Sequence, residues 1–160
     1  MQTRIRNKGS NFDDHSSFDS YVDPKQRAWI EVKGSAIESN VNYLKSRLKN
    51  NCQLMAIVKA DGYGHDAEVV SKYAIKGGAS QLGVATLKEG IKLRYSGIKI
   101  PILILGNLHT KRDLIICLKY NLMPTISSLR ECLICNNIGK SFGTKFPLHL
   151  KVDTGMSRLG

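Results

Sequence analysis

The sequence contains no apolar run that approaches the roughly 18 residues needed to cross a membrane as a helix. Its N-terminal residues are polar and charged, so the apolar stretch of a secretory signal is missing as well. Cysteine is scarce: there are four, in or beside apolar segments and without the spacing of a disulfide framework. These absences argue against a membrane-spanning or disulfide-stapled secreted protein, and we expect a cytoplasmic protein with reduced thiols.

Two further absences concern metals and nucleic acids. Cys132 and Cys135 have the spacing of a redox or zinc pair, but no second Cys or His pair stands at ligand spacing. We therefore interpret this segment as a helix that buries small side chains, and we expect no metal. The net charge is +11, yet the 24 lysines and arginines are spread along the chain without a dense basic run. We expect a solvated basic surface that attracts an anionic ligand, and no nucleic-acid partner.

The composition is that of an ordinary globular protein. The chain has 160 residues, of which 42% are hydrophobic and 23% are charged, which is enough for one core. Residues 1–26 hold Gly, Ser, Asn and Asp with almost nothing apolar. The conformational entropy lost on ordering them would therefore exceed the free energy gained by burying their side chains. We predict that residues 1–26 form a disordered polar tail and that residues 27–160 form the folded part.

Strand and helix patterns alternate from residue 27 to the end. Arg27 to Val32 is a short strand, and Ser35 with Glu38 predicts a capping box that opens the first helix. The next helix is expected to begin near His65 and Asp66, with Asp66 as its N-cap, and to end at Gly77 and Gly78. The remaining expected strands are 53–59, 81–86, 100–105, 122–127 and 147–153, and the remaining expected helices are 87–95, 110–120 and 128–139.

Repeated strand–helix units with nearly continuous aliphatic strands indicate a parallel sheet covered by helices. The strands recur every twenty or so residues, which is typical of a (β/α) barrel or a doubly wound sheet. A complete TIM-type barrel has eight units and about 250 residues. We predict part of such a barrel, with about five parallel core strands.

The most informative stretch begins with the apolar run Leu54 to Val58, which ends abruptly on Lys59. A glycine-rich turn with Tyr63 and His65 follows, and then the helical pattern resumes. A lysine at the C-terminal end of a strand lies where α/β folds carry their chemistry, and desolvation there frees the amine to form a Schiff base. The alternative is a lysine that extends into solvent. For His65 we favour a hydrogen-bonded residue at a helix start over an acid–base group.

A second stretch, near the end of the chain, adds polar residues at the end of the last predicted strand. His149, Lys151 and Asp153 alternate with aliphatic residues and so share one side of that strand. If the aliphatic side packs under helices, the polar side faces the barrel axis. Lys59 and Lys151 are then expected to face the same mouth, with Arg158 as a third positive charge. Such a cluster favours an anion, for example a phosphate or a substrate carboxylate.

These stretches carry a resemblance to a known family. Residues 56–65, AIVKADGYGH, resemble the pyridoxal-phosphate lysine motif of alanine racemases, and residues 151–160, KVDTGMSRLG, resemble the arginine motif of the same family. The segment AWIEV at residues 28–32 is similar to the way these enzymes begin. The resemblance covers residues 27–160. Gly62 and Asp66 depart from it, because the family more often has alanine and glycine there, but neither change threatens the chemistry.

The resemblance implies an isomerase that interconverts L-alanine and D-alanine for peptidoglycan precursors. It further implies an N-terminal barrel that holds pyridoxal 5′-phosphate, a C-terminal β domain and a homodimer. By the same resemblance, Lys59 forms the internal aldimine and is the base for the D-alanine α-proton, and Tyr63 helps hold the cofactor phosphate. Arg158 contacts the pyridine ring oxygen and the substrate carboxylate. Lys151 matches a lysine that is carbamylated in some members, and the carbamate orients that arginine.

Racemisation needs a proton donor or acceptor on each face of the Cα atom. By resemblance the second is a tyrosine of the C-terminal β domain, which we expect to be missing from this sequence. We therefore expect an N-terminal portion of an alanine racemase that alone racemises weakly or not at all. Two alternatives remain: a non-catalytic module that binds pyridoxal phosphate, and another pyridoxal-phosphate barrel enzyme, either a decarboxylase or a racemase of broader amino-acid range.

Overall fold

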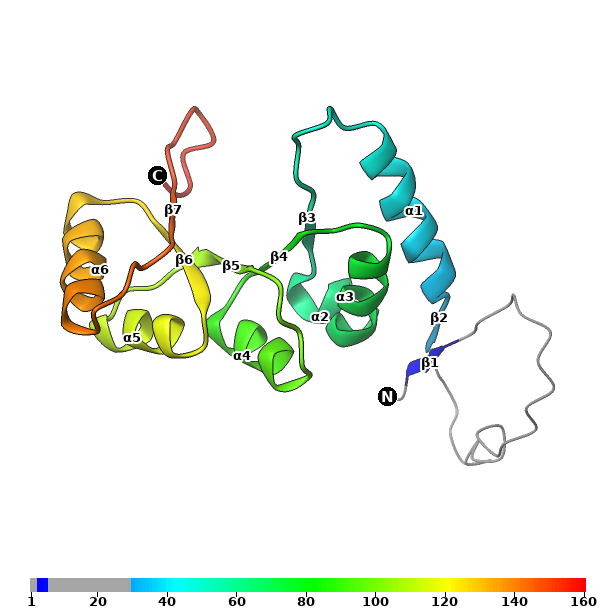
Figure 1. Cartoon of the computed structure of the whole chain (residues 1–160), viewed down its shortest axis with the longest axis horizontal. Helices are drawn as coiled ribbons and strands as arrows, with labels where there is room; N and C mark the ends of the chain where they lie inside the picture. The colour runs from blue at the N-terminus through cyan, green and yellow to red at the C-terminus, as the bar shows by residue number, and fades with distance from the viewer. Residues whose placement is uncertain (1–2, 6–29) are drawn as a thin grey trace.

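The computed structural model describes residues 3–5 and 30–160. In Figure 1 the elements follow one another from the N-terminal strands on the right to α6 on the left. Within the described part of the chain, no helix is both long and apolar enough to span a membrane. The elements in chain order are β1 (Thr3–Ile5), β2 (Ile30–Val32), α1 (Gly34–Ser46), β3 (Met55–Ile57), α2 (Lys59–Tyr63), α3 (Ala67–Lys76), β4 (Gln81–Val84), α4 (Leu87–Tyr95), β5 (Ile102–Asn107), α5 (Lys111–Lys119), β6 (Leu122–Ile126), α6 (Leu129–Ser141) and β7 (His149–Leu150).

Five strands form one parallel sheet in the order β3-β4-β5-β6-β7, with helices between successive strands. All four pairings are parallel, so the C-terminal ends of the strands share one edge of the sheet. The prediction of about five parallel strands with alternating helices is therefore confirmed. Strands β3 and β7 are the two outer strands of this sheet, and β1 and β2 form a separate parallel pair.

The two faces of the sheet carry different side chains. Val58, Val84 and Ile104 are fully buried in the core between the sheet and the helices. Ile57, one residue before Val58, points to the opposite face and is 38% exposed. On that face Gly83 leaves room for Ile57, because a Cβ atom at position 83 would lie 2.6 Å from the Cδ1 atom of Ile57. The alternation predicted for the strand before Lys59 is therefore present.

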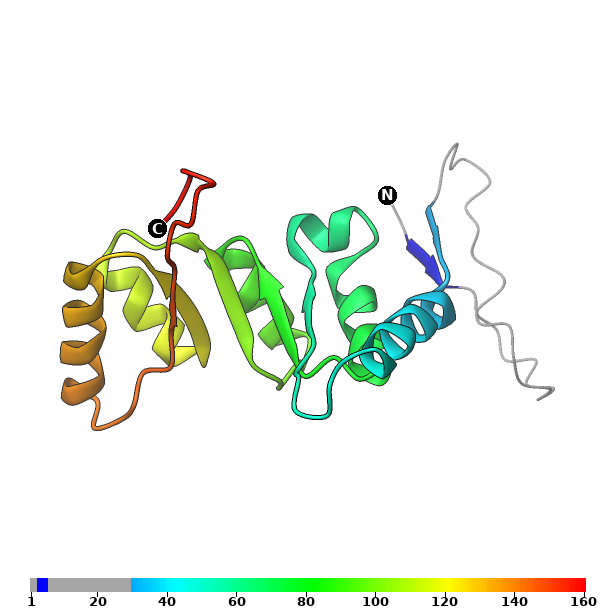
Figure 2. The same cartoon turned by 90° about the horizontal axis from the view of Figure 1, so that it is seen from above.

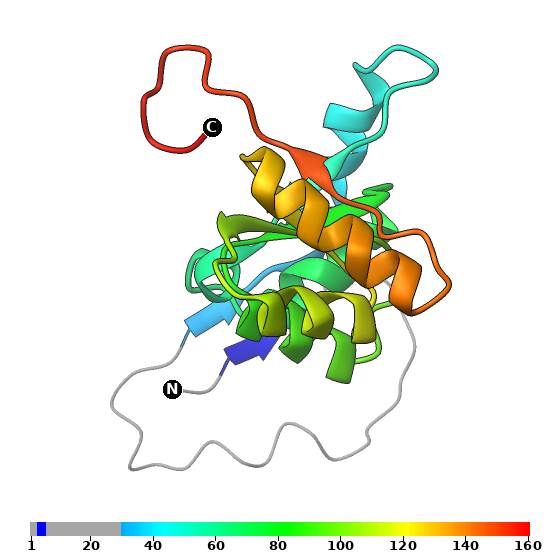
Figure 3. The same cartoon turned by 90° about the vertical axis from the view of Figure 1, so that its left-hand side faces the viewer.

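A second, smaller core lies at the other end of the sheet. Ile126 of β6 packs there with Leu114 of α5 and with Cys135 and Ile138 of α6. Viewed from this end in Figure 3, α6 lies across the front and the C-terminal segment extends away from the helices. Figure 2 shows the same segment projecting beyond the sheet.

Some predicted boundaries are wrong. The capping box at Ser35 and Glu38 does not form, because α1 begins at Gly34 and its N-cap, Lys33, makes no side-chain cap. The cause is packing of α1 against α3: a Cβ atom at Gly34 would overlap the ring of Tyr73, so only glycine lets the helix start there. By contrast, the predicted start of α3 is confirmed, since the Asp66 carboxylate accepts hydrogen bonds from the amides of Glu68 and Val69.

The terminal segments also differ from expectation. Strand β1 at Thr3–Ile5 lies inside the tail that we predicted to be disordered, where its backbone pairs with β2. The rest of that tail, and residues 27–29 of the predicted first strand, lie outside the described residues. The last strand is two residues long instead of the predicted 147–153, and pairing along this outer strand ends when the Lys151 amide donates to the Ile126 carbonyl.

The end of the sheet opposite Lys59 is held by one arginine. Arg94 of α4 donates hydrogen bonds to the carbonyls of Ile98 and Ile100, at 2.8 Å each, in the loop before β5. It also donates to the carbonyls of Tyr120 and Asn121, at 3.0 and 2.7 Å, in the loop before β6. Burial lowers the pKa of this guanidinium from its ordinary value. Arg94 thus ties two loops at the N-terminal ends of neighbouring strands.

Candidate active site

Lys59 lies at the C-terminal end of β3, as the sequence predicts. The residue before it, Val58, is fully buried, and its amide donates a 2.8 Å hydrogen bond to the Gly83 carbonyl of β4. Lys59 itself is half-buried. Among the described residues, no carboxylate forms an ion pair with its ammonium group. The core thus fixes the end of the strand through Val58, and the next residue, Lys59, provides an amine that is not held in an ion pair by the described residues.

The turn after Lys59 has an unusual backbone. Ala60, Asp61, Gly62, Tyr63 and Gly64 all have positive φ, between 51° and 83°, so α2 is a left-handed turn. Left-handed geometry costs about 1–2 kcal/mol for each residue that has a Cβ atom. Gly62 and Gly64 adopt it freely, but the other three do not. Contacts with the rest of the fold must therefore hold this turn in place.

Helix α4 provides two of those contacts. The Glu89 carboxylate accepts a 2.7 Å hydrogen bond from the Ala60 amide, which is the peptide nitrogen directly after Lys59. Three residues further along α4, Lys92 forms a 3.1 Å ion pair with Asp61. Asp61 also accepts a 3.3 Å hydrogen bond from the Ala67 amide at the start of α3. The left-handed turn is thus connected to two helices.

The Asp61–Lys92 pair shifts the protonation of both groups. The hydrogen bond from Lys92 and then that from the Ala67 amide hold the pKa of Asp61 below its usual value. The hydrogen bond to Asp61 in turn raises the pKa of Lys92. Both side chains are more than half exposed, so the pair contributes little to stability, as is usual for surface ion pairs. Its role is to restrain Asp61 within the turn.

Tyr63 lies beside Lys59, and His65 is hydrogen-bonded within the same turn. The ammonium nitrogen of Lys59 is 6.0 Å from the centre of the Tyr63 ring, and that ring is 59% exposed. The Nδ1 atom of His65 lies 3.0 Å from the Tyr63 carbonyl and 3.2 Å from the Gly62 carbonyl. Because carbonyls only accept, Nδ1 must donate, and His65 is a hydrogen-bonded residue at the turn, as we favoured.

The C-terminal motif lies at the other outer strand of the sheet. Lys151 follows β7 directly and is exposed, as is Arg158. The Asp153 carboxylate accepts hydrogen bonds from the amides of Ser157, at 3.0 Å, and Gly155, at 2.9 Å, which fold the loop and hold the pKa of Asp153 low. Three strands separate β3 from β7, or about 19 Å at the usual spacing between neighbouring strands. Lys59 and Tyr63 thus lie together, whereas Lys151 and Arg158 lie across the sheet from them.

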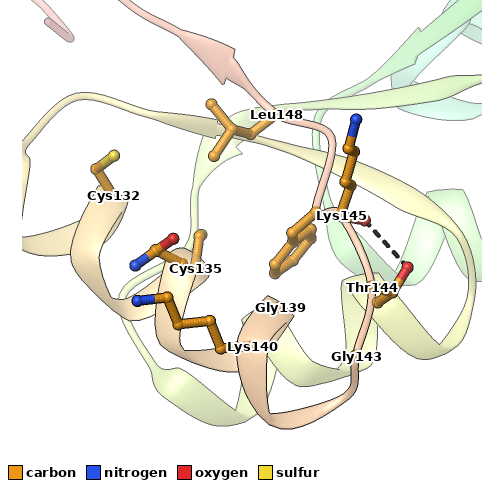
Figure 4. Close-up of a pocket in the computed structure, with 10 residues that line it drawn as sticks. Cys132, Cys135, Gly139, Lys140, Gly143, Thr144, Lys145 and Leu148 are labelled. Carbon is orange, nitrogen blue, oxygen red and sulfur yellow. Dashed lines mark hydrogen bonds between the residues drawn. The ribbon is translucent and has the colours of Figure 1, made fainter.

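A groove of about 540 Å³ lies between α6 and the segment that leads to β7 (Figure 4). Cys132, Cys135, Phe146 and Leu148 are among its lining residues, so it is far along the sheet from Lys59. Cys135 is buried in the core as predicted, and its burial raises the pKa of its thiol to about 11. Cys132 is exposed, so only one of the two cysteines fits the prediction that both are buried.

Glu89 and Lys92 were not identified from the sequence. The spacing of Thr86 and Glu89 is a capping-box signal, and that box is present at the start of α4. This signal concerns the helix alone. The bond from Glu89 to Ala60 joins residues 29 positions apart, which no local pattern records.

Comparison with known proteins connects this site to a family. Residues 32–160 match the family described as alanine racemase, N-terminal domain. The chain is 55% identical over 139 residues to an alanine racemase of Prochlorococcus marinus, which is 87% of this chain and 36% of that protein. The crystal structure of alanine racemase from E. faecalis superposes with a TM-score of 0.69 at 38% identity, over 79% of this chain and 34% of that one. A histidine racemase from Leuconostoc mesenteroides gives a TM-score of 0.70 at 28% identity, again over 79% and 34%.

The matched region contains both motifs and the whole five-stranded sheet. The chain spans about a third of the length of these relatives. The resemblance found in residues 56–65 and 151–160 is therefore confirmed for the N-terminal domain. This chain belongs to the alanine racemase family.

Proposed function

We propose that this chain carries the cofactor-lysine site of a pyridoxal-phosphate-dependent alanine racemase. The observation that carries the proposal is Lys59, an amine without an ion-pair partner among the described residues, at the end of β3 and before a left-handed turn tied to α4. Membership of the family supports alanine as the substrate. The proposal includes a cytoplasmic homodimer that supplies D-alanine for peptidoglycan.

The residues around Lys59 fit pyridoxal 5′-phosphate. An amine that is locked in an ion pair is a poor nucleophile toward an aldehyde, and Lys59 is not locked in this way within the described part of the chain. Tyr63 adds an exposed hydroxyl-bearing ring beside that amine, 6.0 Å from it. Its hydroxyl can donate a hydrogen bond to a phosphate oxygen.

Each chain residue has a proposed role. Pyridoxal phosphate, when bound, withdraws electrons from the amino-acid Cα atom and makes its proton acidic. Lys59 holds the cofactor and moves the α-proton on one face, while Tyr63 binds the phosphate. Arg158 binds the substrate carboxylate, and Lys151, once carbamylated, orients Arg158. A tyrosine outside the 160 residues is proposed to act on the second face.

A racemase of broader amino-acid range is a second candidate. The likeness to a histidine racemase, with a TM-score of 0.70, favours it, because the same N-terminal scaffold occurs in an enzyme named for a larger substrate. The residues proposed to hold the cofactor do not select between side chains. The test of function therefore compares alanine with histidine.

The first experiment locates the cofactor lysine. The purified chain is mixed with pyridoxal phosphate, reduced with borohydride and digested, and the adduct is mapped by mass spectrometry. We expect the adduct to concentrate on Lys59, to disappear in Lys59→Ala and to persist in Lys72→Ala. Lys72 is a suitable control because it is an exposed lysine of α3. An adduct spread evenly over many lysines contradicts the proposal.

The second experiment tests the chemistry on one face. With pyridoxal phosphate and D-alanine in deuterated water, Lys59-dependent deuterium incorporation at Cα reports removal of the α-proton on the face that Lys59 serves, without requiring a second base. We expect exchange in the unmodified chain above the level of Lys59→Ala, and faster exchange with D-alanine than with D-histidine. Equal exchange in the unmodified chain and in Lys59→Ala contradicts the racemase proposal, and faster exchange with histidine favours the broader enzyme.

A further inference from the structure

We propose that helix α4 positions Lys59 through Glu89, with Lys92 as a second attachment, so that Glu89 is a positioning residue for the cofactor amine. The inference rests on the proposed function, since it assigns a task to residues around the same lysine. Its basis is a carboxylate that serves two elements at once.

The two oxygens of Glu89 have separate partners. Oε2 accepts hydrogen bonds from the amides of Ala85, at 2.8 Å, and Thr86, at 2.9 Å, just before α4. This oxygen completes the capping box, in which the Thr86 hydroxyl accepts from the Glu89 amide. Oε1 accepts from the Ala60 amide at 2.7 Å, the shortest of the three bonds. One oxygen thus caps α4, and the other holds the turn after Lys59.

The same chain contains a matched group that only caps. At the start of α6, Oε2 of Glu131 accepts from the amides of Ser127, at 2.8 Å, and Ser128, at 3.1 Å. The Ser128 hydroxyl accepts from the Glu131 amide, so the capping box has the same form as that of Glu89. Within the described part of the chain, no hydrogen bond links Glu131 to another strand end. One carboxylate oxygen is therefore enough for the cap, and the bond to Ala60 is additional.

The additional bond acts on the peptide group between Lys59 and Ala60. It fixes the direction of the Ala60 N–H and hence the plane of that peptide, which sets the backbone torsions on both sides of it. Ala60 has φ 51°, a conformation that a residue with a Cβ atom avoids unless its surroundings impose it. Release of Ala60 lets the turn relax, and the Lys59 side chain moves with it.

Lys92 supports the same turn from the same face of α4. It lies three residues after Glu89, so the two side chains are neighbours on the helix surface. Its ion pair with Asp61 restrains the residue after Ala60. Two successive residues of the left-handed turn are thus attached to one helix, and that helix is anchored in the core by Leu93, which is 1% exposed.

The experiment compares Glu89→Gln with Glu131→Gln in the complete chain. Glutamine still forms a capping box, but its single acceptor oxygen cannot serve both the cap and the Ala60 amide. The probe is pyridoxal phosphate, and the readout is borohydride-trapped adduct on Lys59 relative to the other lysines in the same digest, measured from pH 6 to 9. Unfolding in urea and amide exchange at Ala60 are measured for both variants.

We expect both variants to keep their caps and to remain folded, with a somewhat larger loss of unfolding free energy in Glu89→Gln, which also loses the bond to Ala60. Of these two variants, only Glu89→Gln should raise the pyridoxal-phosphate concentration needed for half-maximal trapping on Lys59. The expected rise is about tenfold, as for a lost hydrogen bond to a charged group. Glu89→Gln should also speed exchange of the Ala60 amide. Lys92→Met, which leaves the cap intact, should give a smaller loss of about two- to threefold, as for an exposed ion pair.

Equal Lys59 selectivity in Glu89→Gln and Glu131→Gln overturns the inference while leaving the proposed function standing. If Glu89→Gln is unfolded, Lys92→Met carries the test, and unchanged trapping on Lys59 in that variant overturns the inference. If the unmodified chain shows no Lys59-selective adduct, it is the proposed function that fails. The two failures are therefore distinguishable.

Discussion

Replacement of Arg94 by methionine should destabilise the fold strongly. Methionine keeps an apolar stem of similar length but removes all four hydrogen bonds to the carbonyls before β5 and β6. A hydrogen bond from a charged donor contributes about 1.5–3 kcal/mol, but the half-buried carbonyls can recover water in part. We therefore expect a loss of about 3 kcal/mol in the free energy of unfolding, a large share of the roughly 5–15 kcal/mol typical of a domain.

The assay is urea unfolding followed by far-ultraviolet circular dichroism, with Arg130→Met as the control. Arg130 is an exposed arginine of α6, so its replacement should change the unfolding free energy by less than about 0.5 kcal/mol. A loss below about 1 kcal/mol for Arg94→Met, with an unchanged slope, would refute the claim that this guanidinium holds the two loops. Where the variant is folded, trapping on Lys59 should be unaffected, because Arg94 acts at the opposite end of the strands.

Two other predictions concern titration and reactivity. In Lys92→Met the pKa of the Asp61 carboxyl, followed by NMR, should rise toward its ordinary value. The ion pair restrains the turn fully above the unfolded pKa of Asp61, near 3.9, and this restraint is lost as the pH falls through the lower pKa of Asp61 in the folded chain. At the alkaline end, the restraint is fully present below the unfolded pKa of Lys92, about 10.4, and is lost as the pH rises through the higher pKa of Lys92 in the folded chain. An Asp61 pKa that does not change would contradict the ion pair. With iodoacetamide at pH 8, Cys52 should react quickly, whereas Cys117, fully buried and with its pKa raised to about 12 by burial, should react only after unfolding; equal rates would show that the core is open.

Local patterns predicted the sheet and the position of Lys59. The aliphatic run that ends at Val58 predicted where the strand ends and that Val58 faces the helices. The Asp66 side chain indicated the start of α3. These features depend on residues that are close together in the chain. The strand pattern is predicted correctly because burial of one strand face requires apolar side chains at every second residue.

The parts that were missed depend on distant residues. Gly62 and Gly64 indicated a turn but not that Ala60, Asp61 and Tyr63 would share their positive φ. That conformation is imposed from α4, about 30 residues away, and propensity alone opposes it. Strand β7 was overestimated because alternation continues to Asp153, whereas backbone pairing with β6 ends with the Lys151 amide.

The left-handed turn has a consequence for the order of folding. It cannot form on its own, because its local preference is right-handed, and both of its attachments to α4 span about 30 residues of chain. The turn therefore closes only after β4 and α4 have docked on β3, later than the helices themselves. Nascent or partly unfolded molecules still carry Lys59, but not its fixed presentation, so selective capture of pyridoxal phosphate reports that the first two strand–helix units have assembled.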